Sequence, residues 1–221
     1  MRYEKKFIVE KNNLNLFNSW LNQTKGIKTS YPDRIVNSIY FDNSNLEFAY
    51  NNLSGISYRY KFRIRWYGKL DTNYNYEIKI KKNELGKKLK LSSKSNLSEV
   101  NIKKLFSYHN EELNNYSDSK KIHYYITNYN LEPILETNYQ RSYYSFMNKL
   151  SLTFDRSLRF KKYKDEITTN YVNDSLSIME IKFNPEDIQV AKNFFKKCIF
   201  TNSRFSKYLR GLAVLGMAQY L

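Results

Sequence analysis

One segment of the sequence carries a cation at every second position. Within residues 58–66, Arg59, Lys61, Arg63 and Arg65 alternate with aromatic and aliphatic residues. Successive side chains of a β-strand point to opposite faces, so the segment predicts a strand with one cationic face. Arginines in such a row can clamp phosphate oxygens bidentately. The pattern therefore predicts a site for a phosphorylated anion.

Further segments place both signs of charge on one strand face. The pairs two residues apart are Glu4 with Lys6, Glu77 with Lys79, and Glu180 with Lys182. Glutamates have no use in binding phosphate alone. Carboxylate oxygens are, however, ligands for Mg²⁺ or Mn²⁺, which bridge phosphate groups. The mixture of charges predicts a divalent metal beside the anion.

A charged strand face can also be an ordinary solvated surface, and for one strand this is the simpler interpretation. It weakens when the opposite faces are considered, because their large aromatic residues need burial under helices. The charged faces would then converge on an interior. Two cations at ~4 Å repel by about 4 kcal/mol at an effective dielectric constant near 20. Such an interior is tolerable only if it is wet, interleaved with carboxylates or filled by an anion.

These faces require strands, and eight are predicted. They are residues 3–9, Val36–Phe41, Tyr58–Trp66, Tyr76–Lys81, Lys87–Leu91, Ile134–Tyr144, Leu150–Phe160 and Ser177–Phe183. Eight antiparallel strands suit closure, which leaves no open edge. The expected fold is therefore α+β: a closed antiparallel eight-stranded β-barrel tunnel with flanking helices, in a single domain over residues 1–221.

Helices are predicted where apolar residues follow the helical period. They cover Asn12–Leu21, a segment capped by Ser98, Ser119–Asn128, Glu186–Lys197 after Pro185, and a last helix from Ser203 to Tyr220. Pro185 suits the first turn, and the acidic Glu186 and Asp187 suit the positive end of the helix dipole. The stretch Asn110–Ser119 is interpreted as a loop.

The composition limits the function classes. The net charge of +16 over 221 residues predicts an anionic partner: nucleic acid, a membrane surface or polyphosphate. Cys198 is the single cysteine, which favours a reducing compartment, and the cytoplasm is expected. The N-terminal residues have no apolar core of a signal peptide, and no apolar run is long enough for a membrane span.

The motifs, in their order along the chain, resemble those of a known family. They are Glu4-Lys5-Lys6, Ser38-Ile39-Tyr40-Phe41-Asp42, the segment 61–67, Glu77-Ile78-Lys79, the basic hairpin with Lys88 and Lys90, Pro133 through Arg141, Thr153-Phe154-Asp155, Glu180-Ile181-Lys182, and Ser206-Lys207-Tyr208. Nearly the whole chain resembles the VTC domain, the polyphosphate polymerase branch of the triphosphate tunnel metalloenzymes. Each motif is common by itself, and their order and spacing carry the resemblance.

The resemblance implies roles for individual residues. The catalytic candidates that bind the phosphates are Arg63, Arg65, Lys79, Arg141 and Lys207. The further phosphate-binding candidates are Lys6, Lys90 (or Lys88), Lys149, Lys182 and Arg159. The metal candidates for Mn²⁺ or Mg²⁺ are Glu180 and, more weakly, Glu4 and Glu77.

One departure from the family pattern concerns the strand that contains the T-x-D motif. The family often has an arginine four residues before the aspartate, and this chain has Ser151 there. Lys149 is expected on the same strand face and is the candidate substitute, although it lacks a bidentate fork. Arg159 shares that parity.

Three classes of function remain open. The first is a polyphosphate polymerase that transfers the γ-phosphoryl group of ATP or another nucleoside triphosphate to a polyphosphate chain. The second is a metal-dependent triphosphatase. The third is a module that binds polyphosphate or nucleic acid without catalysis. Nucleic acid is not expected, because the aromatic residues lie opposite the basic faces rather than among them. The sequence leaves open the oligomeric state and a separate membrane partner that exports the product.

Overall fold

The computed structural model describes residues 2–69, 73–83, 85–93, 110–163 and 170–218. Nine antiparallel strands form one sheet in the order β1-β9-β7-β6-β2-β3-β4-β5, with β8 beside β7. They are β1 (Tyr3–Val9), β2 (Ile27–Asp42), β3 (Tyr58–Tyr67), β4 (Tyr74–Lys82), β5 (Leu85–Ser93), β6 (Glu132–Phe146), β7 (Leu150–Lys162), β8 (Val172–Asn173) and β9 (Ser177–Phe183). The eight predicted strands are present, and β8 is an addition.

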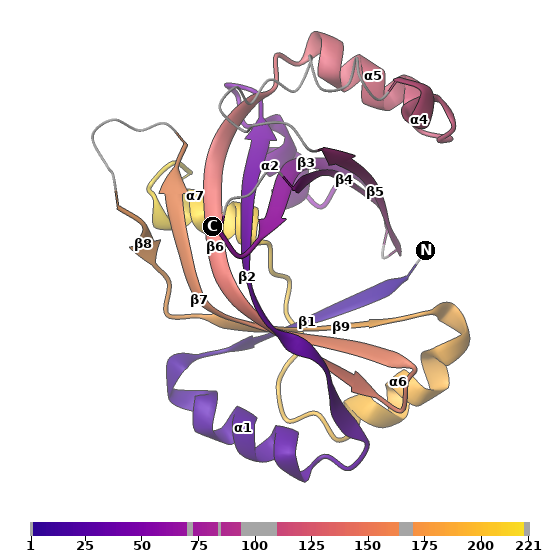
Figure 1. The fold of residues 1–221 in the computed structure, drawn as a ribbon, viewed down its shortest axis with the longest axis vertical. Coiled ribbons are helices and arrows are strands. Elements are labelled where there is room, and N and C mark those ends of the chain that lie inside the picture. Colours follow the sequence, from indigo (N-terminus) through magenta and orange to yellow (C-terminus); the bar gives the residue numbers. More distant parts are fainter. Residues whose placement is uncertain (1, 70–72, 84, 94–109, 164–169, 219–221) are drawn as a thin grey trace.

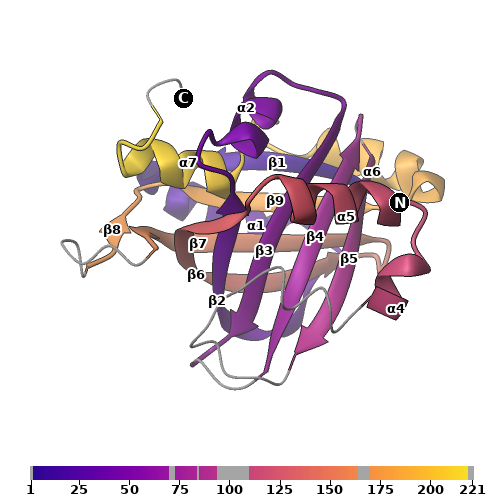
Figure 2. The ribbon, with the colours of Figure 1, turned by 90° about the horizontal axis from the view of Figure 1, so that it is seen from above.

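The sheet bends strongly, and most helices lie on its outer side (Figures 1 and 2). The α-helices are α1 (Leu14–Gln23), α2 (Glu47–Leu53), α4 (Asn110–Asn114), α5 (Ser119–Asn128), α6 (Ile188–Phe195) and α7 (Lys207–Val214), with 3₁₀ turns η1 (Lys11–Asn13) and η2 (Pro185–Asp187). Helix α5 packs over the apolar faces of β3 and β4, where Ile122 and Ile126 join Tyr60 and Ile78 in one core cluster. The aromatic strand faces are therefore buried under helices, as predicted.

Two other core clusters complete the fold. Helices α1 and α6 cover the apolar faces of β1, β7 and β9, through residues such as Phe17 and Phe194. Helix α7 packs against β6 and β7 on the inner side, where Tyr208 stacks on Tyr40. A Cβ atom on Gly211 would come within 2.6 Å of Leu135, so the close approach of α7 depends on this glycine.

The prediction of a closed eight-stranded barrel is wrong, because the sheet is open. Among the described residues, the pairing of the edge strands β1 and β5 is limited to an isolated bridge between Arg2 and Gly86. Beyond this bridge, the edge of β1 that does not face β9 is hydrogen-bonded to residues 202–203. Ser203 N donates to Lys6 O at 2.8 Å, and Phe7 forms a bridge with Asn202. These backbone groups are therefore not available to β5.

Most predicted helices are present, with shifted bounds. Helix α5 coincides with the predicted Ser119–Asn128, whereas α7 begins after Ser206, whose side chain accepts a hydrogen bond from Leu209 N, and not after Ser203. The stretch interpreted as a loop contains α4. The predicted helix capped by Ser98 lies outside the described residues. In the described part of the chain, no helix has the length and apolar character needed to cross a membrane.

Candidate functional site

The charged faces of the strands meet on the inner side of the bent sheet. We call the residues that meet there the central ionic cluster: Glu4, Lys6, Arg63, Arg65, Glu77, Lys79, Lys88, Arg141, Asp155, Glu180, Lys182 and Lys207. Several of its ion pairs connect neighbouring strands, such as β4 with β5 and β6 with β7, and another joins α7 to β7. A further pair joins β1 to β4, which are far apart in the strand order. The convergence predicted from strand parity is therefore present without barrel closure.

Glu77 is the centre of one group of ion pairs. Its side chain is only 2% exposed, and it accepts hydrogen bonds from Arg63 Nε at 2.8 Å and from Lys88 Nζ at 2.8 Å. Arg65 lies 3.8 Å away. Burial alone would raise the pKa of Glu77, but attraction by Arg63, Arg65 and Lys88 outweighs it and lowers the pKa far below its usual value. Glu77 therefore stays ionised and neutralises the arginines around it.

Asp155 is the centre of a second group. Arg141 donates two hydrogen bonds to it, at 2.5 and 2.7 Å, and Lys207 Nζ lies 2.5 Å from Oδ2. Burial opposes ionisation of Asp155, but these two cations outweigh it and lower the pKa to about 2. The sequence motif T-x-D thus supplies the fully buried counter-ion that holds Arg141 and Lys207 in place.

Glu4 and Glu180 form a third group around Lys6. Lys6 Nζ lies 3.1 Å from Glu4 and 3.7 Å from Glu180, Lys79 pairs with Glu4 at 2.7 Å, and Lys182 pairs with Glu180. Burial and repulsion by Glu180 raise the pKa of Glu4, but attraction by the lysines outweighs them and lowers it to about 2. Burial lowers the pKa of Lys79 to about 8, because Glu4 offsets only part of the desolvation.

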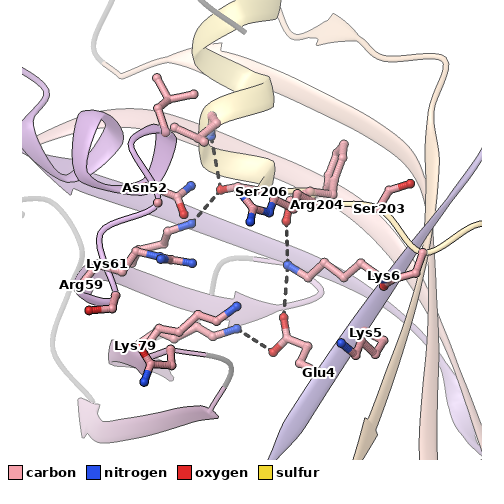
Figure 3. A pocket seen from close by; sticks show the side chains of 18 of the residues that line it. Glu4, Lys5, Lys6, Asn52, Arg59, Lys61, Lys79, Ser203, Arg204 and Ser206 are labelled. Carbon is pink, nitrogen blue, oxygen red and sulfur yellow. Dashed lines mark hydrogen bonds and ion pairs between the residues drawn. The ribbon is translucent and has the colours of Figure 1, made fainter. Parts of the chain in front are cut away.

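A basic pocket opens beside this third group (Figure 3). Its volume is about 550 Å³, and its cations are Lys5, Lys6, Arg59, Lys61, Lys79, Lys81 and Arg204. Glu4 is the one acidic side chain among the described residues that line it. Lys61 donates to Ser206 Oγ at 2.8 Å, and burial with repulsion by Lys6 and Lys79 lowers the pKa of Lys61 well below its usual value. The excess of cations suits an anion with several negative charges.

Neutral hydroxyl groups complete the surroundings of the arginines. Arg65 donates to Ser38 Oγ at 3.1 Å and to Tyr139 Oη at 3.2 Å, and Arg63 donates to Tyr40 Oη at 3.2 Å. The sequence had not indicated Tyr40 or Tyr139 as site residues. Their signal was present, because both fall on the inner face of strands that pair with β3 or β7.

Three predicted site residues are not joined to the cluster by ion pairs among the described residues. Lys90 is exposed on β5, opposite Glu77 in register, but has no ion pair with another described residue. The Lys149 side chain is 55% exposed and lies in the turn before β7, 4.0 Å from Asp187. Arg159 donates to Asn138, on the outer face.

The displacement of Arg159 has a local cause. The register of β6 and β7 shifts between Asn138 and Gln140, and Ser157 has a φ of 53°. A β-bulge of this kind inserts an extra residue into one strand, so side chains beyond it change faces. Asp155 therefore points inward while Arg159 points outward, against the parity expected from the sequence.

Comparison with known proteins identifies the family. The family model of the VTC domain matches residues 1–216. The chain belongs to the VTC domain family. The match covers all of the strands and helices described above, so the resemblance of the motifs is confirmed. No curated protein sequence matches the chain.

Solved structures agree with this VTC domain in fold at low sequence identity. A candidate adenylyl cyclase from Hippeastrum, described as having a dominant triphosphatase activity, has a TM-score of 0.55 at 15% identity, covering 95% of both chains. A candidate adenylate cyclase from Bacillus halodurans has a TM-score of 0.54 at 13% identity, covering 93% of this chain and 94% of that one. The protein PH1819 from Pyrococcus horikoshii has a TM-score of 0.51 at 12% identity, covering 98% and 99%.

Two motifs of the VTC domain are joined by a buried contact. Asp42 accepts a hydrogen bond from Tyr208 Oη at 2.8 Å and also accepts from the backbone N–H groups of Phe48 and Ala49 at 3.0 Å each. It therefore holds the start of α2 and the first turn of α7 together. Because Lys207 precedes Tyr208, this contact also fixes the place of Lys207 in the cluster.

The three glutamates differ in their fitness as metal ligands. Glu77 already accepts from Arg63 and Lys88 on both oxygens, which suits a counter-ion better than a ligand. Glu4 and Glu180 both pair with Lys6, which lies between them, and the two carboxylates repel each other. No group of three or more acidic, histidine or cysteine residues forms a metal cage within the described parts of the chain. A pair of carboxylates fits Mg²⁺ or Mn²⁺, which keep several waters and take substrate phosphates as further ligands.

Proposed function

We propose that this VTC domain is a metal-dependent phosphotransferase that passes the γ-phosphoryl group of a nucleoside triphosphate to a polyphosphate chain. The observation that carries the proposal is the meeting of Arg63, Arg65, Arg141, Lys79 and Lys207 on one inner surface. Phosphoryl transfer is catalysed mainly by positioning and charge stabilisation, and requires no protein nucleophile.

The reaction balances without a covalent enzyme intermediate. A terminal oxygen of the polyphosphate chain forms a new bond to the γ-phosphorus while the bond from that phosphorus to the β-phosphate oxygen breaks. The chain grows by one phosphate and the nucleoside diphosphate leaves with the electron pair of the broken bond. Arg63, Arg65 and Arg141 would stabilise the charge on the transferred group.

The ion pairs of the cluster support this role by keeping the cations in place. Glu77 and Asp155 hold the guanidinium groups of Arg63 and Arg141 through short hydrogen bonds. A site fixed in this way needs little reorganisation when charge develops on the substrate. Lys207 reaches the same centre from α7 and is 4.7 Å from the ring of Tyr139, so its ammonium is also held on two sides.

Glu4 and Glu180 are the residues that would hold the metal ion. When bound, Mg²⁺ or Mn²⁺ would neutralise phosphate charge and orient the phosphate oxygens. Lys6, which lies between these two carboxylates, would then be free to bind the phosphate chain itself. Lys79 and Lys182 would do the same from either side.

The basic pocket suits the polyphosphate chain beyond the reacting phosphates. Lys61 and Lys79 link it to the central ionic cluster, and Arg59 and Arg204 lie farther out along its lining. A chain of phosphates carries about one charge per unit, so a row of cations stabilises each successive unit. Lys61 lacks a carboxylate partner among the described residues, so such an anion would stabilise its charged form.

A triphosphatase is the second candidate. The observation in its favour is the structural neighbour from Hippeastrum, which is described as having a dominant triphosphatase activity on a similar fold. In this case water replaces the chain as the acceptor, and the products are orthophosphate and a diphosphate. The same cations would serve both reactions, so the geometry of the cluster alone does not separate them.

The experiment incubates the protein with ATP and Mn²⁺ and resolves the products on a polyphosphate gel, with ADP and orthophosphate measured in parallel. The proposal expects long polyphosphate with ADP, whereas the triphosphatase gives orthophosphate with little polymer. Arg65→Ala should lower the rate by about a hundredfold, since it removes a charge-stabilising donor. Lys149→Ala is the matched control, because this exposed cation lies outside the cluster, and its rate should equal that of the wild type. Equal polymer from Arg65→Ala and the wild type would contradict the proposal.

A further inference from the structure

Three tyrosines surround an arginine at one end of the inner surface. The guanidinium carbon of Arg34 lies 6.0 Å from the ring centroid of Tyr31 and 5.9 Å from those of Tyr67 and Tyr143. Tyr31 and Tyr143 also meet edge to face, with centroids 5.9 Å apart. We call these four residues the tyrosine–arginine cluster. None of the ion pairs found among the described residues involves Arg34, so aromatic rings are its main partners.

The tyrosine–arginine cluster borders the phosphate-binding arginines. Tyr67 follows Arg65 by two residues on β3, and Tyr143 follows Arg141 by two residues on β6, so each pair shares a strand face at a separation of about 7 Å. Arg34 is the register partner of Arg141. Burial raises the pKa of the Tyr143 hydroxyl, while Arg141 and Arg34 both oppose that rise. Tyr143 therefore lies within electrostatic reach of both arginines.

The basic pocket lies at the opposite end of the same strands. It is lined by Arg59 and Lys61 from the first half of β3, whereas Tyr67 is the last residue of that strand. The two ends of the inner surface therefore differ in chemistry. The basic-pocket end carries seven cations, with Tyr3 as the one tyrosine among the described residues that line it, and the other end carries three tyrosine rings around one arginine.

Accessible aromatic rings beside phosphate-binding arginines have the chemistry that recognises a nucleobase. Tyr31 is 59% exposed and Tyr67 is 42% exposed. Bases stack on tyrosine rings and on guanidinium planes with little dependence on which base is present. A polyphosphate chain or inorganic triphosphate has no ring and therefore gains no stacking energy from the tyrosine faces.

We propose that the tyrosine–arginine cluster binds the base of the nucleoside triphosphate, with the phosphates directed along β3 towards Arg65 and Arg63. This inference rests on the proposed function and adds the orientation of its substrate. The four residue steps from Tyr67 to Arg63 span about 14 Å. That span suits an extended nucleoside triphosphate, so its γ-phosphate would meet the polyphosphate chain that enters from the basic pocket.

The test compares the binding of two ligands that differ in the nucleoside. Isothermal titration calorimetry gives the dissociation constants of ATP and of inorganic tripolyphosphate for the wild type, Tyr67→Ala, Arg34→Ala and Tyr67→Phe. The readout is the ratio of the two constants. In Tyr67→Ala and Arg34→Ala the ratio of the ATP constant to the tripolyphosphate constant should rise about tenfold, the size expected for loss of one stacking partner.

Two variants serve as controls. Tyr67→Phe keeps the ring and should keep the wild-type ratio, which separates stacking from a hydroxyl contact. Tyr124→Ala removes an exposed ring on α5, outside the tyrosine–arginine cluster, and should also keep the wild-type ratio. A ratio that stays unchanged in both Tyr67→Ala and Arg34→Ala would overturn the inference while leaving the proposed function intact. A wild type that binds neither ligand would overturn the proposed function, and this inference with it.

Discussion

The ammonium of Lys79 lies 2.7 Å from a carboxylate oxygen of Glu4, although their strands, β4 and β1, are far apart in the strand order of the sheet. A flat sheet would hold these strands several strand spacings of about 4.8 Å apart. The contact therefore shows that the sheet bends strongly. This bend brings the charges of separate strands onto one surface.

The lowered pKa of Lys79 predicts that anion binding depends on pH. Its pKa of about 8 lies below the usual value, so the ammonium loses its proton as the pH rises through 8. The affinity for inorganic tripolyphosphate should therefore fall between pH 7 and pH 9.5. Lys79→Arg, which keeps its charge in this range, should show a flatter profile when both are measured by calorimetry. Parallel profiles for the two proteins would contradict the role of Lys79.

Lys79 also has a consequence for stability. Between pH 8 and about 10.5 the unfolded chain binds a proton at this lysine and the folded chain does not, so the free energy of unfolding rises with pH there. Below pH 8 the lysine is protonated in both states, and its unfavourable burial is fully present. Urea titrations at pH 7.5 and 9.5 give the change in unfolding free energy between these two pH values for each protein. This change should be smaller in Lys79→Met than in the wild type. A difference that is unchanged would contradict this assignment.

The depressed pKa values of Glu4 and Asp155 predict a loss of stability in acid. Both have pKa values of about 2 in the folded state, below the usual range, so they stabilise the fold above their unfolded pKa values. This stabilisation should be lost as the pH falls from about 5 to 2. Asp155→Asn should show a smaller fall in unfolding free energy between pH 6 and pH 3, because the titrating group is gone.

Glu77→Gln should destabilise the fold by about 3 kcal/mol, since it leaves Arg63 and Arg65 buried with less compensation. Urea denaturation at pH 7 measures this change. Glu186→Gln, on the exposed turn η2, is the control and should change the free energy of unfolding by less than about 0.5 kcal/mol. Near-equal effects of the two substitutions would show that Glu77 is not an important counter-ion.

Glu180→Gln should weaken the binding of Mn²⁺ in the presence of tripolyphosphate by about tenfold or more, because it removes one of two proposed carboxylate ligands. Calorimetric titration with Mn²⁺ measures this without any turnover. Glu77→Gln is the informative comparison, since Glu77 is engaged by Arg63 and Lys88 and should affect metal affinity less. The reverse ranking would assign the metal to the other side of the cluster.

Tyr208→Phe should cost about 2 kcal/mol of unfolding free energy, because the buried carboxylate of Asp42 loses a hydrogen-bond donor. If the contact positions Lys207, Tyr208→Phe should also reduce the turnover rate at saturating ATP, measured at a temperature where the variant is fully folded. Asp42→Asn combined with Tyr208→Phe should then be less damaging than the sum of the single changes.

Local alternation was enough to predict which strand faces carry the central ionic cluster. The parity of Arg63, Glu77 and Glu180 depends only on the alternation of neighbouring side chains, and the structure brings all three to one surface. For Arg159, alternation predicts the wrong strand face. The β-bulge at Ser157 reverses the parity of β7, and the sequence around it gives no clear signal of an extra residue.

Barrel closure was the larger error, because it depends on distant segments. The number of strands and the instability of exposed sheet edges both favoured closure. The edge of β1 is instead hydrogen-bonded to residues 202–203. Lys149 was misplaced for a related reason: β7 begins at Leu150, so the residue before it belongs to a turn near Asp187. Such assignments require the tertiary structure.

The backbone contact between Ser203 and Lys6 joins points that are nearly the whole chain apart, and the strand partner of β1 is β9. During synthesis β1 therefore emerges long before any of its partners exist. Contacts between such distant segments form late and slowly. A nascent chain that has not reached Lys207 lacks one cation of the central ionic cluster, and one that has not reached Glu180 also lacks the strand partner of β1, so the cluster can be completed only after residue 207 has been made.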